Sequence, residues 1–194
     1  DYDVRFRLGS LEVVVVDRDF LEATKALKSF CPQFHLSLQS GEDNTLKKMN
    51  RHYTTEEYKR AVDLIREYYP NAAITTDIMV GFPGETDEDF NETVSVVKKV
   101  NFSGAFTFIY SRRKGTPADK MPNQIPPEIS KKRIIELINL QNSINRKDSK
   151  NYLGKTVQIL CEGFDEKKKL YLGRDEYGRM AYFASSTDLI GQFV

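Results

Sequence analysis

The sequence predicts an α/β domain with parallel strands, followed by a small all-β barrel. Two observations support this class. Over residues 1–152, short apolar runs alternate with longer segments of helical period, which is the pattern of a parallel sheet. Over residues 154–194, the segments are short, rich in β-favouring residues and separated by turns. We therefore divide the chain near Tyr152 into two domains, residues 1–152 and residues 153–194.

Each element of the first domain has its own local signal. Four apolar runs predict strands, at residues 4–8, 34–38, 73–80 and 105–110. Thr54 and Glu57 have the spacing of a capping box and predict a helix that ends before Pro70. Thr86 and Asp89 repeat this signal before a second helix, and residues 128–150 predict a third, long helix. In the second domain, strands are expected at residues 156–161, 169–173, 179–184 and 191–194.

Alternation along the strands separates an apolar side from a polar side. The apolar sides are Val4, Phe6 and Leu8, then Phe34, Leu36 and Leu38, then Ile74, Ile78 and Val80. The polar sides are Arg5 and Arg7, then His35, Ser37 and Gln39, then Thr75, Asp77 and Met79. If the apolar sides contact the helices, the polar sides line the hollow of a curved sheet and imply a polar ligand. Alternatively, Arg5, Arg7 and Asp77 pair with one another as buried ions.

The positions of several polar residues relative to the predicted strands favour a ligand site over a network of buried ions. Glu12, Gln39 and the loop at residues 81–86 fall at or just after the carboxyl ends of strands, where parallel α/β folds bind ligands. The glycine-containing loop leads into a helix N-terminus and could accept a carboxylate. Four parallel strands cannot close a barrel, so we also expect earlier strands to precede Asp1.

Composition limits the alternatives. The net charge is +1, from 29 Lys and Arg against 28 Asp and Glu, so any contact with nucleic acid must be a local patch. Cys31 and Cys161 are the two cysteines, which suits a reducing compartment, and we expect a cytoplasmic protein. The apolar runs at residues 11–16 and 72–80 are too short to span a bilayer, so no membrane partner is expected. Two isolated histidines argue against a metal-dependent hydrolase.

Four long motifs carry a family resemblance. They are FHLSLQSG at residues 34–41, LKKMNRHYTTEEY at 46–58, AITTDIMVGFPGET at 73–86 and AFTFIYSRRKGTP at 105–117. The chain resembles the radical S-adenosylmethionine (SAM) methylthiotransferases, which add a methylthio group to carbon 2 of a modified adenosine beside the tRNA anticodon, or to a ribosomal protein. Residues 154–194 resemble the RNA-binding TRAM domain of these enzymes. The resemblance covers nearly the whole chain and implies a partial radical SAM barrel followed by an OB-like TRAM barrel.

The resemblance also implies site residues. Glu12 and Arg51 correspond to residues that hold the amino and carboxylate groups of SAM, and Gln39 and Asp77 to residues that hold its ribose hydroxyls. These residue types suit a zwitterion and a pair of vicinal hydroxyls. The family's C-x-x-x-C-x-x-C motif is absent, and valines fill residues 13–16, where the family has proline after Glu12. We therefore expect the ligands of two 4Fe–4S clusters to lie in a missing N-terminal half, and this chain alone to be inactive.

Basic and aromatic residues indicate RNA contact, with the anticodon stem-loop of tRNA as the expected partner. The candidates are Arg112, Arg113 and Lys114 after the fourth strand, and Lys155, Tyr171, Arg174 and Arg179 in the second domain. Within the family, the motifs are most similar to the branch that modifies threonylcarbamoyladenosine at position 37. The isopentenyladenosine branch is the alternative, and the ribosomal-protein branch fits less well because its terminal domain tends to be acidic. A non-catalytic RNA-binding module remains a second alternative.

Overall fold

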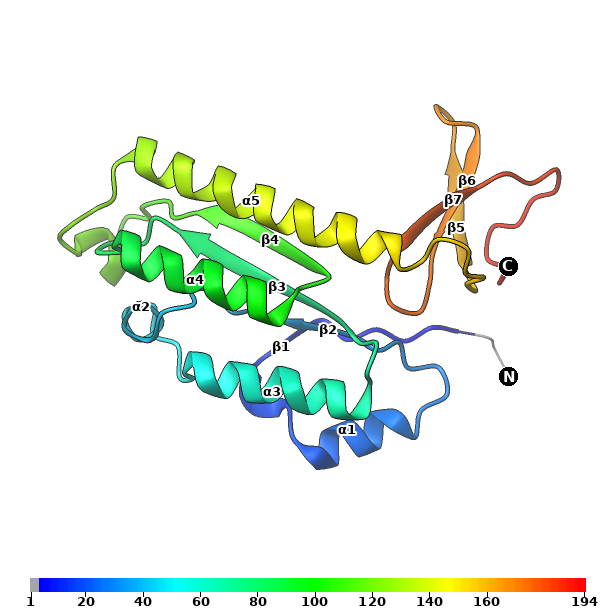
Figure 1. The fold of residues 1–194 in the computed structure, drawn as a ribbon, viewed down its shortest axis with the longest axis horizontal. Coiled ribbons are helices and arrows are strands. Elements are labelled where there is room, and N and C mark those ends of the chain that lie inside the picture. The colour runs from blue at the N-terminus through cyan, green and yellow to red at the C-terminus, as the bar shows by residue number, and fades with distance from the viewer. Residues whose placement is uncertain (1–3) are drawn as a thin grey trace.

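The computed structural model describes residues 4–194 and contains two sheets (Figure 1). The first sheet is built from β1 (Ser10–Leu11), β2 (Gln33–Leu36), β3 (Ala73–Val80) and β4 (Gly104–Ile109). These strands are parallel and lie in the order β1-β2-β3-β4. The predicted parallel sheet is therefore confirmed, with β3 at the predicted residues and β2 and β4 displaced by one or two.

The predicted first strand at residues 4–8 is wrong. This segment forms only an isolated bridge between Phe6 and Phe30, and regular pairing begins at Ser10. Phe6 is 59% exposed, so the apolar side predicted here is not buried against helices. The physical reason is a set of distant contacts. Arg5 donates to the carbonyl of Arg174, and Arg7 donates to the carbonyl of Asp175 at 2.7 Å, which turns this segment toward the second sheet.

The helices cover one side of the first sheet. They are α1 (Arg18–Lys25), α2 (Asp43–Lys48), α3 (Thr55–Tyr68), α4 (Asp87–Val100) and α5 (Pro127–Lys150). Both predicted capping boxes are present, at the starts of α3 and α4. Along the sheet, α1 contacts α3, α3 contacts α4, and α4 contacts α5 (Figure 1). No helix within residues 4–194 combines the length and apolar character needed to cross a membrane.

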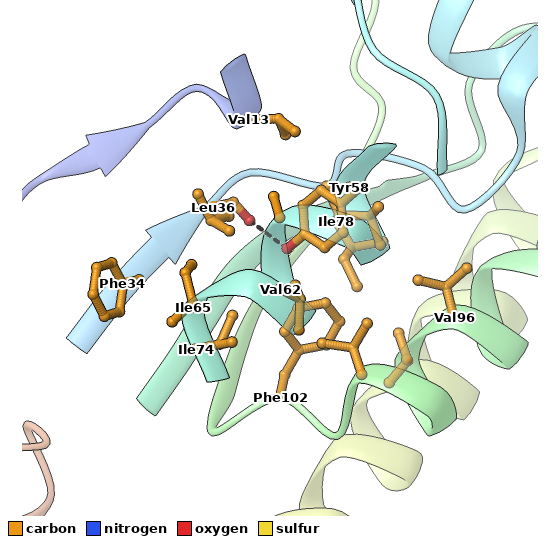
Figure 2. Packing of buried hydrophobic residues seen from close by; sticks show 14 of the residues in the cluster. Val13, Phe34, Leu36, Tyr58, Val62, Ile65, Ile74, Ile78, Val96 and Phe102 are labelled. Atoms are coloured by element: carbon orange, nitrogen blue, oxygen red, sulfur yellow. Dashed lines mark hydrogen bonds between the residues drawn. The ribbon is translucent and has the colours of Figure 1, made fainter. Parts of the chain in front are cut away.

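The core lies between the sheet and these helices (Figure 2). The predicted apolar sides of β2 and β3 are confirmed, because Phe34, Leu36, Ile74 and Ile78 are fully buried. Tyr58 of α3 reaches into this layer and donates its hydroxyl to the Leu36 carbonyl at 2.8 Å. Each large apolar side chain buried in this way stabilises the fold by roughly 1.5–3 kcal/mol. The helix side of the sheet is therefore closed to ligands.

The second sheet is antiparallel and three-stranded. Its strands are β5 (Leu160–Asp165), β6 (Leu170–Arg174) and β7 (Met180–Phe183). A small all-β unit is thus confirmed, but within residues 4–194 it does not close into the predicted barrel. The segment at 191–194 is no strand and pairs only through a bridge between Leu160 and Phe193. The predicted strand at 156–161 begins later, at Leu160.

The second sheet lies at the carboxyl end of α5 (Figure 1). Arg179 precedes β7 and forms an ion pair with Asp148 of α5 at 3.0 Å. Its guanidinium also lies over the ring of Tyr152, 4.1 Å from the centroid, and 3.7 Å from the buried carboxylate of Asp175. This cluster, together with Arg7 on the Asp175 carbonyl, fixes the second sheet against the first domain.

Candidate functional site

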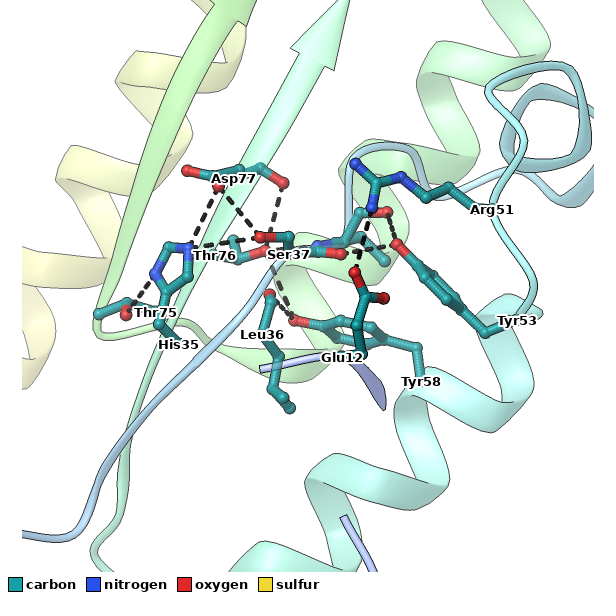
Figure 3. Close-up of polar contacts among 11 residues, drawn as sticks. Glu12, His35, Leu36, Ser37, Arg51, Tyr53, Tyr58, Thr75, Thr76 and Asp77 are labelled. Carbon is teal, nitrogen blue, oxygen red and sulfur yellow. Dashed lines mark hydrogen bonds and ion pairs between the residues drawn. The ribbon is translucent and has the colours of Figure 1, made fainter. Parts of the chain in front are cut away.

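The open side of the sheet carries a connected set of polar side chains (Figure 3). His35 Nδ1 lies 3.0 Å from the Thr75 hydroxyl, and His35 Nε2 lies 3.2 Å from Oδ2 of Asp77. Ser37 donates to the same Asp77 oxygen at 3.0 Å. The predicted alternation is therefore correct for β2 and β3. Neighbouring strands place their polar residues side by side, facing away from the core.

Asp77 keeps one oxygen available. Both of its contacts use Oδ2, and within residues 4–194 no hydrogen bond is made to Oδ1, while the side chain is 28% exposed. Arg5 and Arg7 bind backbone carbonyls near β6 and do not pair with Asp77. The alternative of an internal ion network among these three residues is therefore wrong. Asp77 can accept a hydrogen bond from a ligand without giving up its present partners.

Gln39 lies three residues after the end of β2 and forms an isolated bridge with Ile78 of β3. Its φ of 63° is unusual for a residue other than glycine. The backbone is held there by two bonds to β3, because Gln39 N donates to the Asp77 carbonyl at 2.8 Å and Met79 N donates to the Gln39 carbonyl at 2.9 Å. The amide side chain makes no hydrogen bond within the described residues and faces a cavity. Local strain of this kind is common where a backbone presents a side chain to a ligand.

Glu12 and Arg51 form the charged part of the site (Figure 3). Arg51 Nη1 lies 3.6 Å from Glu12 Oε1, and their side chains are 31% and 65% exposed, so both charges remain accessible. Glu12 is followed by the buried Val13, which begins the short 3-10 helix η1 (Val13–Val15) and anchors this segment. Tyr53 follows Arg51 and donates its hydroxyl to the Ser37 carbonyl at 2.6 Å. Burial raises the pKa of Tyr53 to about 12, so it stays a donor.

A cavity of about 890 Å³ opens at the carboxyl ends of the strands. Its lining includes Gln39, Arg51, Met79, Phe82, Tyr110 and Arg113. This volume lies in the range that holds small-molecule ligands. Asp77 and Glu12 do not line the cavity themselves. Asp77 lies two residues before Met79 on the same side of β3, and Glu12 reaches the cavity through its ion pair with Arg51.

The loop at residues 81–86 uses several of its N–H groups for hydrogen bonds within the protein. Gly81 N donates to Glu85 Oε1 at 2.9 Å, and the N-terminus of α4 is capped by its own side chains. Glu85 is buried and pairs with Arg133 of α5 at 2.6 Å. A role of the remaining N–H groups toward a carboxylate stays a prediction. The loop also contributes Phe82 to the cavity wall.

Sequence reasoning missed Arg133, although a signal was present. Arg133 lies in the buried stripe of α5, one turn before Leu137, where an apolar residue is expected. Burial raises the pKa of the Glu85 carboxyl above its usual value, while the Gly81 N–H and the Arg133 guanidinium oppose that rise. An arginine inside an apolar stripe indicates a buried acidic partner. It does not indicate which acid.

The predicted RNA residues after β4 are not equivalent. Arg112 is held by its own loop, since Nε lies 3.0 Å from Asp119 Oδ1 and Nη2 donates to the Asp119 carbonyl at 2.7 Å. Arg113 lines the cavity. Lys114 is exposed and has no ion pair within residues 4–194. Of the three, Arg113 is thus the one best placed to meet a cavity ligand.

The predicted RNA residues of the second domain, residues 153–194, differ in their contacts. Arg174 pairs with Glu162, and Arg179 is part of the junction with α5. The ring of Tyr171 lies between those of two phenylalanines, with centroids 5.0 Å and 6.1 Å away. Lys155 is exposed and lies 5.6 Å from the centroid of Tyr152. An RNA role for these four residues stays a prediction.

Cys31 and Cys161 are both buried, and burial raises the pKa of the Cys31 thiol. Within residues 4–194, no group of three His, Cys, Asp or Glu side chains has an arrangement that could hold a metal ion.

The sequence is similar to a known protein family and to curated relatives. Residues 7–97 match the model of the radical SAM superfamily. The chain is 46% identical over 178 residues to a tRNA-2-methylthio-N(6)-dimethylallyladenosine synthase of Clostridium botulinum (strain Langeland), covering 91% of this chain and 39% of the relative. A synthase with the same name from Caldicellulosiruptor saccharolyticus is 44% identical, with 91% and 37% covered. The chain thus spans about two fifths of the length of these curated relatives.

A solved structure supports the fold. The chain superposes on coproporphyrinogen III oxidase from Escherichia coli, a radical SAM enzyme, with a TM-score of 0.62 and 17% sequence identity. The superposition covers 98% of this chain and 43% of the other. At this identity the similarity concerns the fold alone. It confirms the predicted fold class, a partial (β/α) barrel with parallel strands.

Proposed function

On the premise that residues 7–97 form a radical SAM domain, we propose that this chain is the SAM-holding and RNA-facing part of a tRNA methylthiotransferase. The observation that supports the proposal most strongly is local. Four side chains of the types that SAM requires, from four separate segments, gather at and beside one cavity at the carboxyl ends of the strands. Homology to curated tRNA-modifying synthases supports the reaction class.

The residues present suit SAM. Glu12 and Arg51 offer opposite charges to the amino and carboxylate groups of a zwitterion, and both remain accessible beside the cavity. Gln39 offers an amide without a partner, and Asp77 offers Oδ1, which suits a pair of vicinal hydroxyls. Met79 and Phe82 supply apolar wall for an adenine ring. The Glu12–Arg51 pair must loosen when both groups engage a ligand.

Each role follows from how the side chain is held. His35 and Ser37 hold Asp77 Oδ2, which leaves Oδ1 without a hydrogen bond within residues 4–194. The backbone bonds of Gln39 place its amide at the rim of the cavity. Tyr53 ties the segment after Arg51 to the end of β2. With a 4Fe–4S cluster held elsewhere in the intact protein, bound SAM supplies reductive cleavage chemistry.

The nucleoside assignment needs a correction. The sequence motifs suggested threonylcarbamoyladenosine, but the curated relatives are named as synthases of 2-methylthio-N(6)-dimethylallyladenosine. The threonylcarbamoyl assignment is therefore not supported. We propose the alternative, dimethylallyladenosine (isopentenyladenosine) in tRNA, as the substrate of the intact protein.

Mass analysis of tRNA nucleosides tests this proposal. Cells that lack the intact gene should retain dimethylallyladenosine and lose its 2-methylthio derivative, while threonylcarbamoyladenosine and its derivative stay unchanged. The wild-type gene should restore the product, and a gene carrying Asp77→Ala should not. Loss of a threonylcarbamoyl derivative instead would overturn the substrate. An unchanged nucleoside profile would overturn the reaction.

A further inference from the structure

The outward side of α5 has an unusual composition toward its carboxyl end. Six side chains line one shallow groove of about 360 Å³ there, and all six are exposed: Asn139, Asn142, Ser143, Arg146, Lys147 and Lys150. Side chains that are three, four, seven or eight residues apart lie on one face of a helix, and these six residues have such spacings. The face extends over the 12 residues from Asn139 to Lys150, or roughly 17 Å at a rise of 1.5 Å per residue. We call it the basic face of α5.

This face contains no acid. Between Leu137 and Lys150 the one acidic residue is Asp148. It lies on the same side of the helix as the buried Leu137 and Ile144, and it pairs with Arg179. Asp148 therefore lies on the opposite side of the helix, against the second sheet. The exposed Glu136 is one turn further toward the N-terminus, beyond the groove.

The cations of the basic face are also unpaired, unlike many others in the chain. Within residues 4–194, none of the six side chains forms a hydrogen bond or an ion pair. By contrast, Arg18, Arg112 and Arg174 are exposed or half-buried and each pairs with a carboxylate. A chain with a net charge of +1 has acids enough to pair these groups, so an unpaired basic strip is a local concentration of positive charge.

From this arrangement we propose that the basic face of α5 is a docking surface for the phosphate backbone of RNA. Cations there neutralise phosphates, and the asparagine and serine side chains offer hydrogen bonds to phosphate and sugar oxygens, without selecting a base sequence. The face ends with the last residue of α5, and the second sheet begins ten residues later in the chain. RNA held there continues from the second sheet along α5. The inference rests on the proposed function, because it takes tRNA as the RNA.

Binding of an unmodified tRNA transcript to the intact protein tests the proposal. The test variant is Arg146→Gln with Lys147→Gln and Lys150→Gln. The matched control is Arg60→Gln with Lys98→Gln and Lys99→Gln, which removes the same charges from exposed positions on α3 and α4. Both triple variants should keep the wild-type thermal unfolding temperature and SAM affinity.

The test variant should bind tRNA at least about tenfold more weakly at 0.1 M salt, and its slope of log K against log salt should be shallower by about two to three. The control should match the wild type in both quantities. Equal affinity and slope in the two triple variants would overturn the basic face as an RNA surface. So would weakened binding to phosphatidylglycerol vesicles with unchanged tRNA binding. If the wild-type protein binds no tRNA, the proposed function itself fails.

Discussion

Removing Arg133 should destabilise the loop that forms one wall of the cavity. The Arg133→Met variant would leave the Glu85 carboxylate buried, at 3% side-chain exposure, without the partner that now lies 2.6 Å away. Breaking one side of a buried pair typically costs about 3–5 kcal/mol. That cost corresponds to roughly two to four orders of magnitude in a local opening equilibrium. Methionine preserves most of the side-chain volume, so the loss reports on charge more than on packing.

The sign of the pH dependence follows from the pKa of Glu85. Burial raises this pKa already in the wild type, and loss of Arg133 removes one of the groups that oppose the rise. In the variant, the folded state therefore favours the protonated acid. The destabilisation should be smallest near the pKa of an unfolded glutamate, about 4.3, and should grow as the pH rises through the higher folded value.

Hydrogen exchange measured by mass spectrometry on the intact protein can resolve this effect. Peptides covering residues 81–86 and the first half of α5 should exchange about a hundredfold or more faster in Arg133→Met at pH 7.5, after correction for intrinsic rates. The neighbouring exposed Lys132→Met variant is the control and should show no change. The double variant Glu85→Gln with Arg133→Met should recover part of the loss. Equal losses in the single and double variants would refute the buried-charge explanation.

Three further predictions concern stability. Glu42→Ala removes the side chain that caps α2 and should cost about 1 kcal/mol at pH 7. Burial tends to raise the pKa of Glu42, but the N–H groups that it caps lower it overall, so this cost should vanish as unfolding is measured at increasingly acid pH. Gly41→Ala places a methyl group 2.4 Å from the Thr93 backbone and should lower the free energy of unfolding by about 1–3 kcal/mol in urea titration. Tyr58→Phe leaves the Leu36 carbonyl without its donor and should cost about 1–3 kcal/mol in the same assay, whereas an unchanged midpoint would contradict the buried hydrogen bond.

Elements with local signals were predictable from the sequence. The capping boxes of α3 and α4 depend on residues three positions apart, and β3 has a continuous apolar side, so their bounds were nearly correct. The helix α2 was missed because it has only six residues and because its N-cap is Glu42, a residue type that is not common at that position. The polar alternation of β2 and β3 also sufficed to bring Asp77 and Gln39 to one side of the sheet.

Contacts between distant segments were not predictable. The alternation at residues 4–8 resembles that of a strand, but Arg5 and Arg7 bind carbonyls about 170 residues away, near β6. The partner of Arg133 lies 48 residues earlier in the chain. Such pairs depend on how the two domains and the long helix meet. A sequence can reveal a charged residue at a position where an apolar one is expected, but the fold determines which group pairs with it.

The most direct test of the account is the affinity of the intact protein for SAM, measured by equilibrium dialysis. Asp77→Ala and Gln39→Ala should each weaken SAM binding by at least about tenfold, since each removes hydrogen bonds to the ribose, while the thermal unfolding temperature stays close to that of the wild type. The exposed Asp63→Ala variant on α3 is the control and should bind as the wild type does. Wild-type affinity in both site variants would contradict the assignment of the polar sheet side and its cavity to SAM.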